Sequence, residues 1–383
     1  MSFTANLVHH PRRLWLRRAA FQVHLWAGIL LAVYLVLIAL SGSVLVYKDE
    51  LTRWALPPGL HAYQHARIAS PKMVMTQFTA AEPNGTVINL QVPSTVLPVF
   101  LLEGKDGAGR PARWIADPIT GCPHLAPRTW LDTVHDLHYY LLLPASWGMQ
   151  ANAVGAAILL LLALTGAFLW WPGLRAWTRG LRLNLRSNWR RMNYDLHSAI
   201  GFWTLAIVVW WAISGVYFGW YREVATIVSW VSPLQGMQAP VSASLSPAAS
   251  GSHASLDQVL FAAESASPQG QLWSVSDPSL RTPESYVLLD RGAPGDFSHR
   301  DIVRIRTTDT RVISVWHYGE RHSLGDWVLW SMHPLHFGTL WGPVVKLVWF
   351  LLGLSLGILT VTGLLMYWNR YLRRLFSSRR GDR

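Results

Sequence analysis

The sequence has one cysteine, Cys122, and few charged residues. A single cysteine has no partner for an intramolecular disulfide, and it excludes a cysteine-ligated iron–sulfur cluster. The chain also lacks a Gly-x-Gly-x-x-Gly motif after a strand and a phosphate-binding Walker loop, and its cytoplasmic segments are too short for a flavin or nicotinamide fold. Any electrons that the protein uses must therefore come from another molecule.

The long apolar segments contain no acidic residues, which argues against an ion-coupled transporter. Of the 383 residues, 51% are hydrophobic and 14% are charged. Four stretches each hold about 20 apolar residues, the length that crosses a hydrocarbon core. The sequence therefore predicts a polytopic membrane protein.

The formal net charge of +12 is concentrated in three arginine-rich flanks, at 12–18, 175–191 and 370–383. Short arginine-rich flanks stay in the cytoplasm, so both termini are expected there. The location predicted is the bacterial inner membrane, with the lipid bilayer and its anionic headgroups as the partner of these arginines and no role for nucleic acid.

The predicted fold is an all-α four-helix bundle in the membrane, with an internal two-fold repeat and two small periplasmic α+β domains. The predicted order is a basic N-terminus (1–22), a first span (23–47), a periplasmic domain (48–133), a histidine helix and second span (134–171), a basic loop (172–196), a third span (197–221), a second periplasmic domain (222–326), a histidine helix and fourth span (327–368), and a basic C-terminus (369–383).

The two halves share a spacing of motifs. Gly42 of a Ser-Gly pair follows His24 by eighteen residues, and Gly215 of another follows His197 by the same distance. In the returning spans, Thr165-Gly166 and Thr362-Gly363 have corresponding places. Such self-similarity is common in membrane proteins and indicates a pseudo-two-fold arrangement.

Four histidines stand at the entries of the four spans: His24 and His197 on the cytoplasmic side, and His138 and His336 on the periplasmic side. Each pair offers two neutral imidazoles, the axial ligands of a low-spin b-type haem. The expectation is two haem b groups per chain. Copper is the weaker alternative because no methionine or cysteine cluster accompanies these positions.

Glycines leave room for a flat macrocycle near the cytoplasmic pair, because Gly28 and Gly201 lie four residues after His24 and His197. Two further histidines, His135 and His333, share a helix face with the favoured periplasmic ligands and compete with them. Four cations are candidate partners of the haem propionates: Arg18, Arg190 and Arg191 at the cytoplasmic end, and Lys346 at the periplasmic end.

His61 and His65 lie four residues apart in the first periplasmic segment. On one face of a helix, such a pair would bind a metal. We favour the interpretation that both histidines lie in a loop and are exposed to solvent.

Several short motifs together resemble the PepSY-associated transmembrane family over nearly the whole chain. They are the His-x-x-x-Gly starts, the four Ser/Thr-Gly pairs, Asp117-Pro-Ile-Thr-Gly121 and Leu256-Asp-Gln-Val. The sequence is most similar to iron-regulated inner-membrane members of the FoxB type, which are ferric-siderophore reductases. The resemblance implies PepSY-like periplasmic domains, one haem on His24 and His197, and one on His138 and His336.

The expected function is therefore transfer of electrons from a membrane quinol or a cytoplasmic reductase to periplasmic ferric siderophore, with release of ferrous iron. This makes the chain an oxidoreductase with no catalytic residue beyond the haem ligands. Two alternatives stay open: a haem-free permease for siderophore or iron, and a regulatory membrane protein of the PepSY type.

Overall fold

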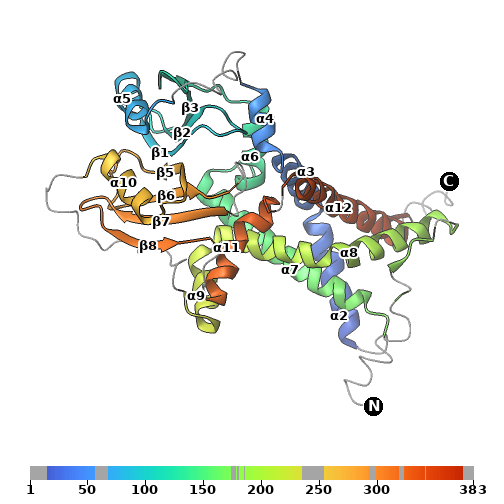
Figure 1. Ribbon diagram of the computed structural model, residues 1–383. Helices are drawn as coiled ribbons and strands as arrows, with labels where there is room; N and C mark the ends of the chain where they lie inside the picture. Colours follow the sequence, from blue (N-terminus) through green and yellow to red (C-terminus); the bar gives the residue numbers. More distant parts are fainter. Residues whose placement is uncertain are drawn as a thin grey trace.

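The computed structural model describes residues 15–56, 68–173, 178, 181–184, 186–234, 254–292, 299–318, 323–340 and 342–373. His61 and His65 lie outside these ranges. A β-sheet stands at one end of a group of long helices, and the helices extend away from it (Figure 1). We call this end the sheet side, and the opposite end, where Arg17 and Arg370 lie, the arginine side.

Three helices are long and apolar enough to cross a membrane: α7 (Ala145–Trp170), α8 (Trp189–Gly219) and α12 (Pro343–Tyr367), which continues into a π-helical turn, Trp368–Leu372. The first apolar segment is not one helix. It is divided into α2 (Trp15–Leu30) and α3 (Ala32–Leu45), which meet at an angle of 65° and make a fourth crossing if counted as one span. The chain is thus a membrane protein.

The long helices pack through small and branched apolar side chains. α7 runs beside α8 and α2, and α12 beside α3 and α8. Buried between them are Leu35, Ala39, Leu162, Val208, Ala212 and Leu356. Because lipid tails are as apolar as these side chains, close packing rather than the hydrophobic effect holds such helices together.

All eight strands belong to one antiparallel sheet of order β4-β3-β2-β1-β5-β6-β7-β8. The strands are β1 (Thr86–Gln91), β2 (Phe100–Lys105), β3 (Pro111–Ala116), β4 (Pro123–Leu125), β5 (Gln271–Ser276), β6 (Glu284–Asp290), β7 (Arg300–Arg306) and β8 (Val312–Trp316). Helices α5 (Pro71–Ala81) and α10 (Leu256–Ala266) cover one face and share its core, which contains Phe78, Trp114 and Val259.

The predicted fold class, a four-helix bundle with two small separate domains, is wrong. Within the described residues there are eleven α-helices, three uninterrupted candidate spans and one eight-stranded sheet. The two predicted domains share one sheet because each contributes a first strand at its edge, and the backbone groups of an edge strand need hydrogen-bond partners. β1 and β5 supply them to each other, from Asn89 opposite Ser276 to Gln91 opposite Ser274.

Four short helices lie between the sheet and the long helices: α4 (Lys48–Trp54), α6 (Trp130–Tyr140), α9 (Tyr221–Val231) and α11 (Leu324–Phe337). The expectation that each periplasmic-side histidine stands on a separate short helix is confirmed for α6 and α11. α6 ends at Leu141 and α11 at Gly338, both in the left-handed region, and these reversals let α7 and α12 start in new directions.

Both histidine helices are docked on the sheet. The Arg113 guanidinium of β3 lies 2.7 Å from the Asp132 carboxylate of α6. On the other half, the Trp316 ring of β8 contacts the Trp327 and Trp330 rings of α11, at centroid distances of 5.4 and 6.3 Å. The position of each histidine helix is therefore tied to the half-sheet from its own repeat.

Candidate functional site: two histidine pairs

The structure brings the four predicted histidines together in two pairs. On the arginine side, the rings of His24 in α2 and His197 in α8 have centroids 6.5 Å apart and stand edge to face. On the sheet side, the rings of His138 in α6 and His336 in α11 have centroids 6.4 Å apart. Histidines more than 170 residues apart in the sequence thus meet at two depths, with nearly equal spacing.

The spacing suits two imidazoles that bind opposite sides of one metal ion. A metal–imidazole bond is about 2.0–2.1 Å long, and a ring nitrogen lies roughly 1.1 Å from the ring centroid, so the centroids would be about 6.3 Å apart. Within the described residues, no three His, Cys, Asp or Glu side chains gather to hold a metal ion. Each pair therefore fits a metal whose remaining ligands come from a non-protein group.

Hydrogen bonds fix the orientation of both arginine-side rings. His24 Nδ1 lies 3.1 Å from the Leu162 carbonyl and 3.1 Å from the Thr165 hydroxyl, both in α7. In the other half, His197 Nδ1 lies 3.0 Å from the Leu359 carbonyl and 2.9 Å from the Thr362 hydroxyl in α12. A carbonyl can only accept, so Nδ1 carries the proton and the Nε2 lone pair is available for a metal.

On the sheet side, the hydroxyls come from the outgoing helices. Ser41 Oγ lies 3.0 Å from His138 Nδ1, and Ser214 Oγ lies 2.7 Å from His336 Nδ1. Both hydroxyls donate to the carbonyl four residues earlier, at Leu37 and Trp210, so their oxygens accept the imidazole proton. In all four histidines, Nδ1 is thus hydrogen-bonded to a serine or threonine hydroxyl.

In three of the four Ser/Thr-Gly pairs, the glycine makes room for a histidine ring. A Cβ at Gly42 would lie 2.7 Å from His138 Cε1, and a Cβ at Gly166 would lie 3.1 Å from His24 Cε1. At Gly363 the distance to His197 Cε1 would be 3.4 Å. Gly215 differs, because its Cβ would meet Ala156 of α7 instead. In three of four cases, one dipeptide supplies both the hydroxyl that orients a ring and the space for it.

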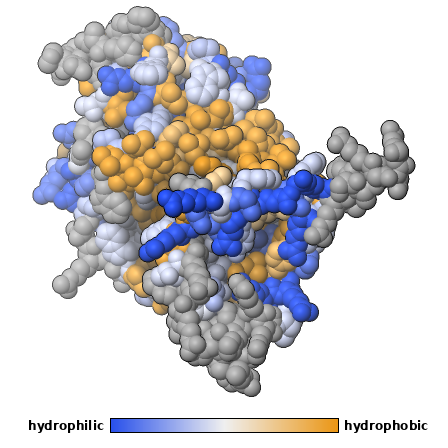
Figure 2. Space-filling model, turned by 90° about the vertical axis from the view of Figure 1, so that its right-hand side faces the viewer, coloured by the Kyte–Doolittle hydropathy of each residue, from blue (hydrophilic) through white to orange (hydrophobic). Residues whose placement is uncertain are grey.

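A cavity of about 890 Å³ extends from the arginine side into the helices and reaches His24 and His197. Gly28 and Gly201 line it, as predicted, and a Cβ at either would come no closer than 3.7 Å to a neighbouring atom. The rest of the wall is mostly apolar, with Phe21, Leu162, Trp170, Phe202, Leu359 and Tyr367 among its residues. Figure 2 looks onto this end of the molecule, where a band of hydrophilic side chains crosses a hydrophobic surface.

The cations at the cavity are Arg17, Arg18 and Arg370. Arg17 donates to the carbonyls of Phe168, Leu169 and Trp171 and so joins α2 to the end of α7. The Arg370 guanidinium lies 4.8 Å from the centre of the Phe21 ring. Of the predicted propionate partners, only Arg18 lines the cavity.

The other predicted cations lie elsewhere. Arg190 and Arg191 are exposed, and Arg191 forms an ion pair of 2.9 Å with the buried Asp195 one turn later. Lys346 in α12 lies 2.7 Å from Glu50 of α4, so its charge is balanced within the protein. This ion pair offsets the free-energy cost of placing a charged lysine in an apolar segment.

The competing histidines occupy different surroundings. His135 stacks on Tyr139 at 4.2 Å and lies 3.2 Å from Asp136. His333 packs against Phe218, with centroids 4.9 Å apart. The close histidine pair on the sheet side is His138 with His336, which favours these two as ligands.

The residues that orient the histidine rings were not predicted from the sequence. The Ser/Thr-Gly pairs were interpreted only as signs of the internal repeat, and their contact with the histidines was not foreseen. The prediction also missed Asn152, whose side chain donates to the His138 carbonyl at 2.7 Å and accepts from the Tyr34 hydroxyl at 2.6 Å. The equal spacing of the dipeptides was the signal that could have pointed to their role.

The family model of the PepSY-associated TM region matches residues 21–370. This range includes all four histidines and all four Ser/Thr-Gly pairs. Among curated proteins, the search found no significant match to the chain.

Proposed function

The chain belongs to the PepSY-associated transmembrane family, and we propose that it is a di-haem reductase of the bacterial inner membrane. It would carry electrons from a cytoplasmic reductase or the quinol pool to ferric siderophore in the periplasm. The observation that carries this proposal is the pair of histidine sites, with ring centroids 6.5 and 6.4 Å apart and each Nδ1 hydrogen-bonded.

The donor set supports haem b more than a bare metal ion. Each site has two imidazoles, and within the part of the chain that the structure describes no third ligand joins them. A porphyrin supplies four equatorial nitrogens and leaves two axial positions, which matches two histidines. When bound, haem supplies a reversible one-electron couple at each of the two depths.

The protein's own residues would bind and orient these groups. At the arginine-side site, His24 and His197 would be the axial ligands, and Gly28 and Gly201 would leave space for the ring faces. Arg18 and Arg370, at the same cavity, would neutralise the propionates. At the sheet-side site, His138 and His336 would take the axial positions, held by Ser41 and Ser214.

The charge distribution supports the orientation in the membrane that this electron transfer needs. Arginine-rich ends remain in the cytoplasm, so the sheet would stand in the periplasm and the sheet-side pair would be nearest the acceptor. Two centres divide a hydrocarbon core of about 30 Å into shorter steps, which is useful when donor and acceptor are on opposite sides. One electron converts the ferric iron of the siderophore to ferrous iron, which most siderophores bind far more weakly.

Haem content is the first test of this proposal. The purified protein should show the spectrum of low-spin b-type haem and close to two haems per chain in a pyridine haemochrome assay. A protein with no haem after expression in haem-replete cells would contradict the proposal, and would favour a permease or a regulatory PepSY-type protein.

The acceptor is tested separately. Chemically reduced protein, mixed anaerobically with a panel of ferric siderophores and a ferrous chelator, should be reoxidised as the ferrous complex appears. Reoxidation by a quinone, with none by any siderophore in the panel, would instead assign the chain as a quinone-linked cytochrome.

Orientation is tested at Cys122, the partly exposed thiol between β3 and β4. A membrane-impermeant thiol reagent should label it from the periplasmic side of intact spheroplasts. Labelling that requires lysis of the membrane, in protein whose thiol reacts freely, would place the sheet in the cytoplasm.

A further inference from the structure

Helix α9 has three distinct faces. One packs on the protein, where Val224, Ala225 and Val228 contact α8 and α11. A second is polar and exposed, with Thr226 and Ser229. The third is apolar and exposed: Ile227 is 53% accessible, Trp230 77% and Val231 84%. At 100° per residue, the three apolar side chains form a stripe along the last turns of α9, separate from Thr226 and Ser229. The exposed Glu223 lies on the same side in the first turn, at the start of the stripe.

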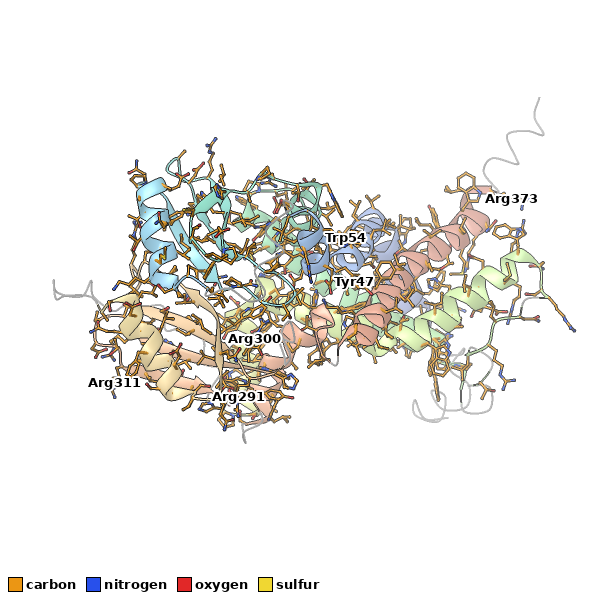
Figure 3. The ribbon with its side chains drawn as sticks, turned by 45° about the horizontal axis from the view of Figure 1, so that its top comes forward. Tyr47, Trp54, Arg291, Arg300, Arg311 and Arg373 are labelled. Carbon is orange, nitrogen blue, oxygen red and sulfur yellow. The ribbon has the colours of Figure 1, made fainter. Side chains whose placement is uncertain are left out.

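The first repeat has an equivalent feature. α4 follows the outgoing α3 as α9 follows the outgoing α8, and it ends at Trp54, which is 87% exposed. α4 and α9 leave the long helices on opposite sides, at the level where the sheet begins (Figure 1). Figure 3 shows Trp54 at the boundary between the sheet and the long helices.

The exposed apolar surface continues around the same level. In the first repeat, Leu142 and Leu143 between α6 and α7 are exposed, and so is Trp147 at the start of α7. In the second repeat, Val344 at the start of α12 is 72% exposed. These exposed apolar residues lie at or just before the starts of α7 and α12, at the end of the spans that faces the sheet.

We propose that the apolar stripe of α9 and the end of α4 lie in the lipid headgroup region of the leaflet on the sheet side. A lipid surface accounts for this composition, because tryptophan prefers the membrane interface and an amphipathic helix lies in its plane. The polar face with Thr226 and Ser229 then faces water. This proposal rests on the chain being a membrane protein and is independent of its electron-transfer function.

The consequence is a fixed height for the sheet-side site. α9 packs against α11, the helix that carries His336, through a cluster with Tyr217, Leu329 and Met332. Insertion of α9 into the interface would hold α11 at that level. The lipid surface, the sheet and the long helices would together position the sheet-side histidine pair.

The experiment uses the full-length chain in nanodiscs of phosphatidylethanolamine and phosphatidylglycerol. In a Cys122→Ser background, single cysteines replace Ile227 or Trp230 on the apolar stripe, and Thr226 or Ser229 on the neighbouring polar face. Each is spin-labelled, and its collisions with oxygen, which concentrates in lipid, are compared with those of a water-soluble nickel chelate.

Labels at positions 227 and 230 should collide more with oxygen, whereas labels at 226 and 229 should collide more with the chelate. Preference for the chelate at 227 and 230 would place the stripe in water and overturn the proposal. Protection from both reagents at these positions would also overturn it, because protein, such as a second copy of the chain, would then cover the stripe. Since Ile227 and Trp230 are both exposed, the failure of one variant to fold leaves the other as the test.

Discussion

The two histidine pairs have similar ring spacing and hydrogen-bond partners but stand on different helices. On the arginine side, His24 and His197 belong to long helices, and the hydroxyls that hold them come from neighbouring long helices. On the sheet side, His138 and His336 belong to short helices that are docked on the sheet, and only their serine partners lie in α3 and α8. The roles of outgoing and returning segments are thus exchanged between the two depths.

This difference separates what each site depends on. The arginine-side pair needs only the packing of α2, α7, α8 and α12. The sheet-side pair also needs the contacts of α6 and α11 with β3 and β8. A change in the sheet should therefore disturb the sheet-side pair and leave the arginine-side pair unchanged. The predictions below test this separation, beginning with the largest expected effect.

Loss of a ligand should remove one site entirely. His24→Ala or His197→Ala should leave one low-spin haem per chain, and His138→Ala or His336→Ala should remove the other low-spin centre, because the low-spin state expected of each haem needs both imidazoles. Haem content and redox titration measure this. His135→Ala and His333→Ala are the controls and should keep both haems; loss of a haem from either would reassign the sheet-side ligand.

Adding a methyl group beside a ring should have a graded effect. Gly42→Ala places Cβ 2.7 Å from His138 Cε1, Gly166→Ala 3.1 Å from His24 Cε1, and Gly363→Ala 3.4 Å from His197 Cε1. Overpacking typically costs about 1–3 kcal/mol, so the disturbance should decrease in this order. The low-spin electron paramagnetic resonance signal reports ring orientation.

Gly357→Ala is the matched control for this series, because Gly357 does not line the cavity and its Cβ would meet only Ala39, at 3.8 Å. A signal that is unchanged in Gly42→Ala would mean that the ring of His138 is free to move away. The proposed role of the glycine would then be wrong.

Removal of a hydroxyl should have a smaller effect that differs between the sites. For His336 Nδ1, Ser214 is the only partner found in the described part of the chain. His197 keeps the Leu359 carbonyl when Thr362 is changed. Loss of such a supporting hydrogen bond typically costs 10–100-fold in metal affinity. Haem dissociation should therefore accelerate in Ser214→Ala well beyond Thr362→Val, and equal rates would argue against this reading of the hydrogen bonds.

The smallest expected effect concerns the docking of α6. Burial works to raise the pKa of the Asp132 carboxyl, but hydrogen bonds from Thr129 and the charge of Arg113 outweigh it, so the pKa lies below its usual value. A carboxyl with a lowered pKa stabilises the fold above its unfolded pKa of about 3.9, and this contribution is lost as the pH falls.

Arg113→Met should thus destabilise the sheet-side site at neutral pH by about 1 kcal/mol. The difference from the unmodified chain should shrink as the pH falls through the lowered pKa of Asp132, which lies below its unfolded value of about 3.9. Thermal unfolding followed at the two haem signals measures this. Equal destabilisation of both signals would contradict the separation of the two sites.

Much of the site was predictable from local patterns. Apolar runs of about 20 residues indicated the long helices, and equal spacing of histidines from Ser/Thr-Gly pairs indicated that the positions are equivalent in two repeats. The histidine helices predicted before the second and fourth spans correspond to α6 and α11. These features could be predicted because each depends on residues within a single helical turn or a single span.

The errors concern contacts between distant segments. Nothing near Leu31 signals the 65° bend between α2 and α3, since no proline is present there. Arg190 and Arg191 were named from nearness in sequence, whereas Arg17, Arg18 and Arg370 are the arginines that line the cavity in the described part of the chain.

The sequence by itself determined which segments enter the membrane and which histidines are equivalent, because hydropathy and repeat spacing are properties of the linear chain. Only the tertiary structure decided that β1 pairs with β5, that each imidazole meets a hydroxyl from another helix, and that Lys346 is paired with Glu50. Such contacts depend on packing between residues up to about 300 positions apart, and local physical chemistry does not specify which distant partner satisfies a strand edge, a ring nitrogen or a charge.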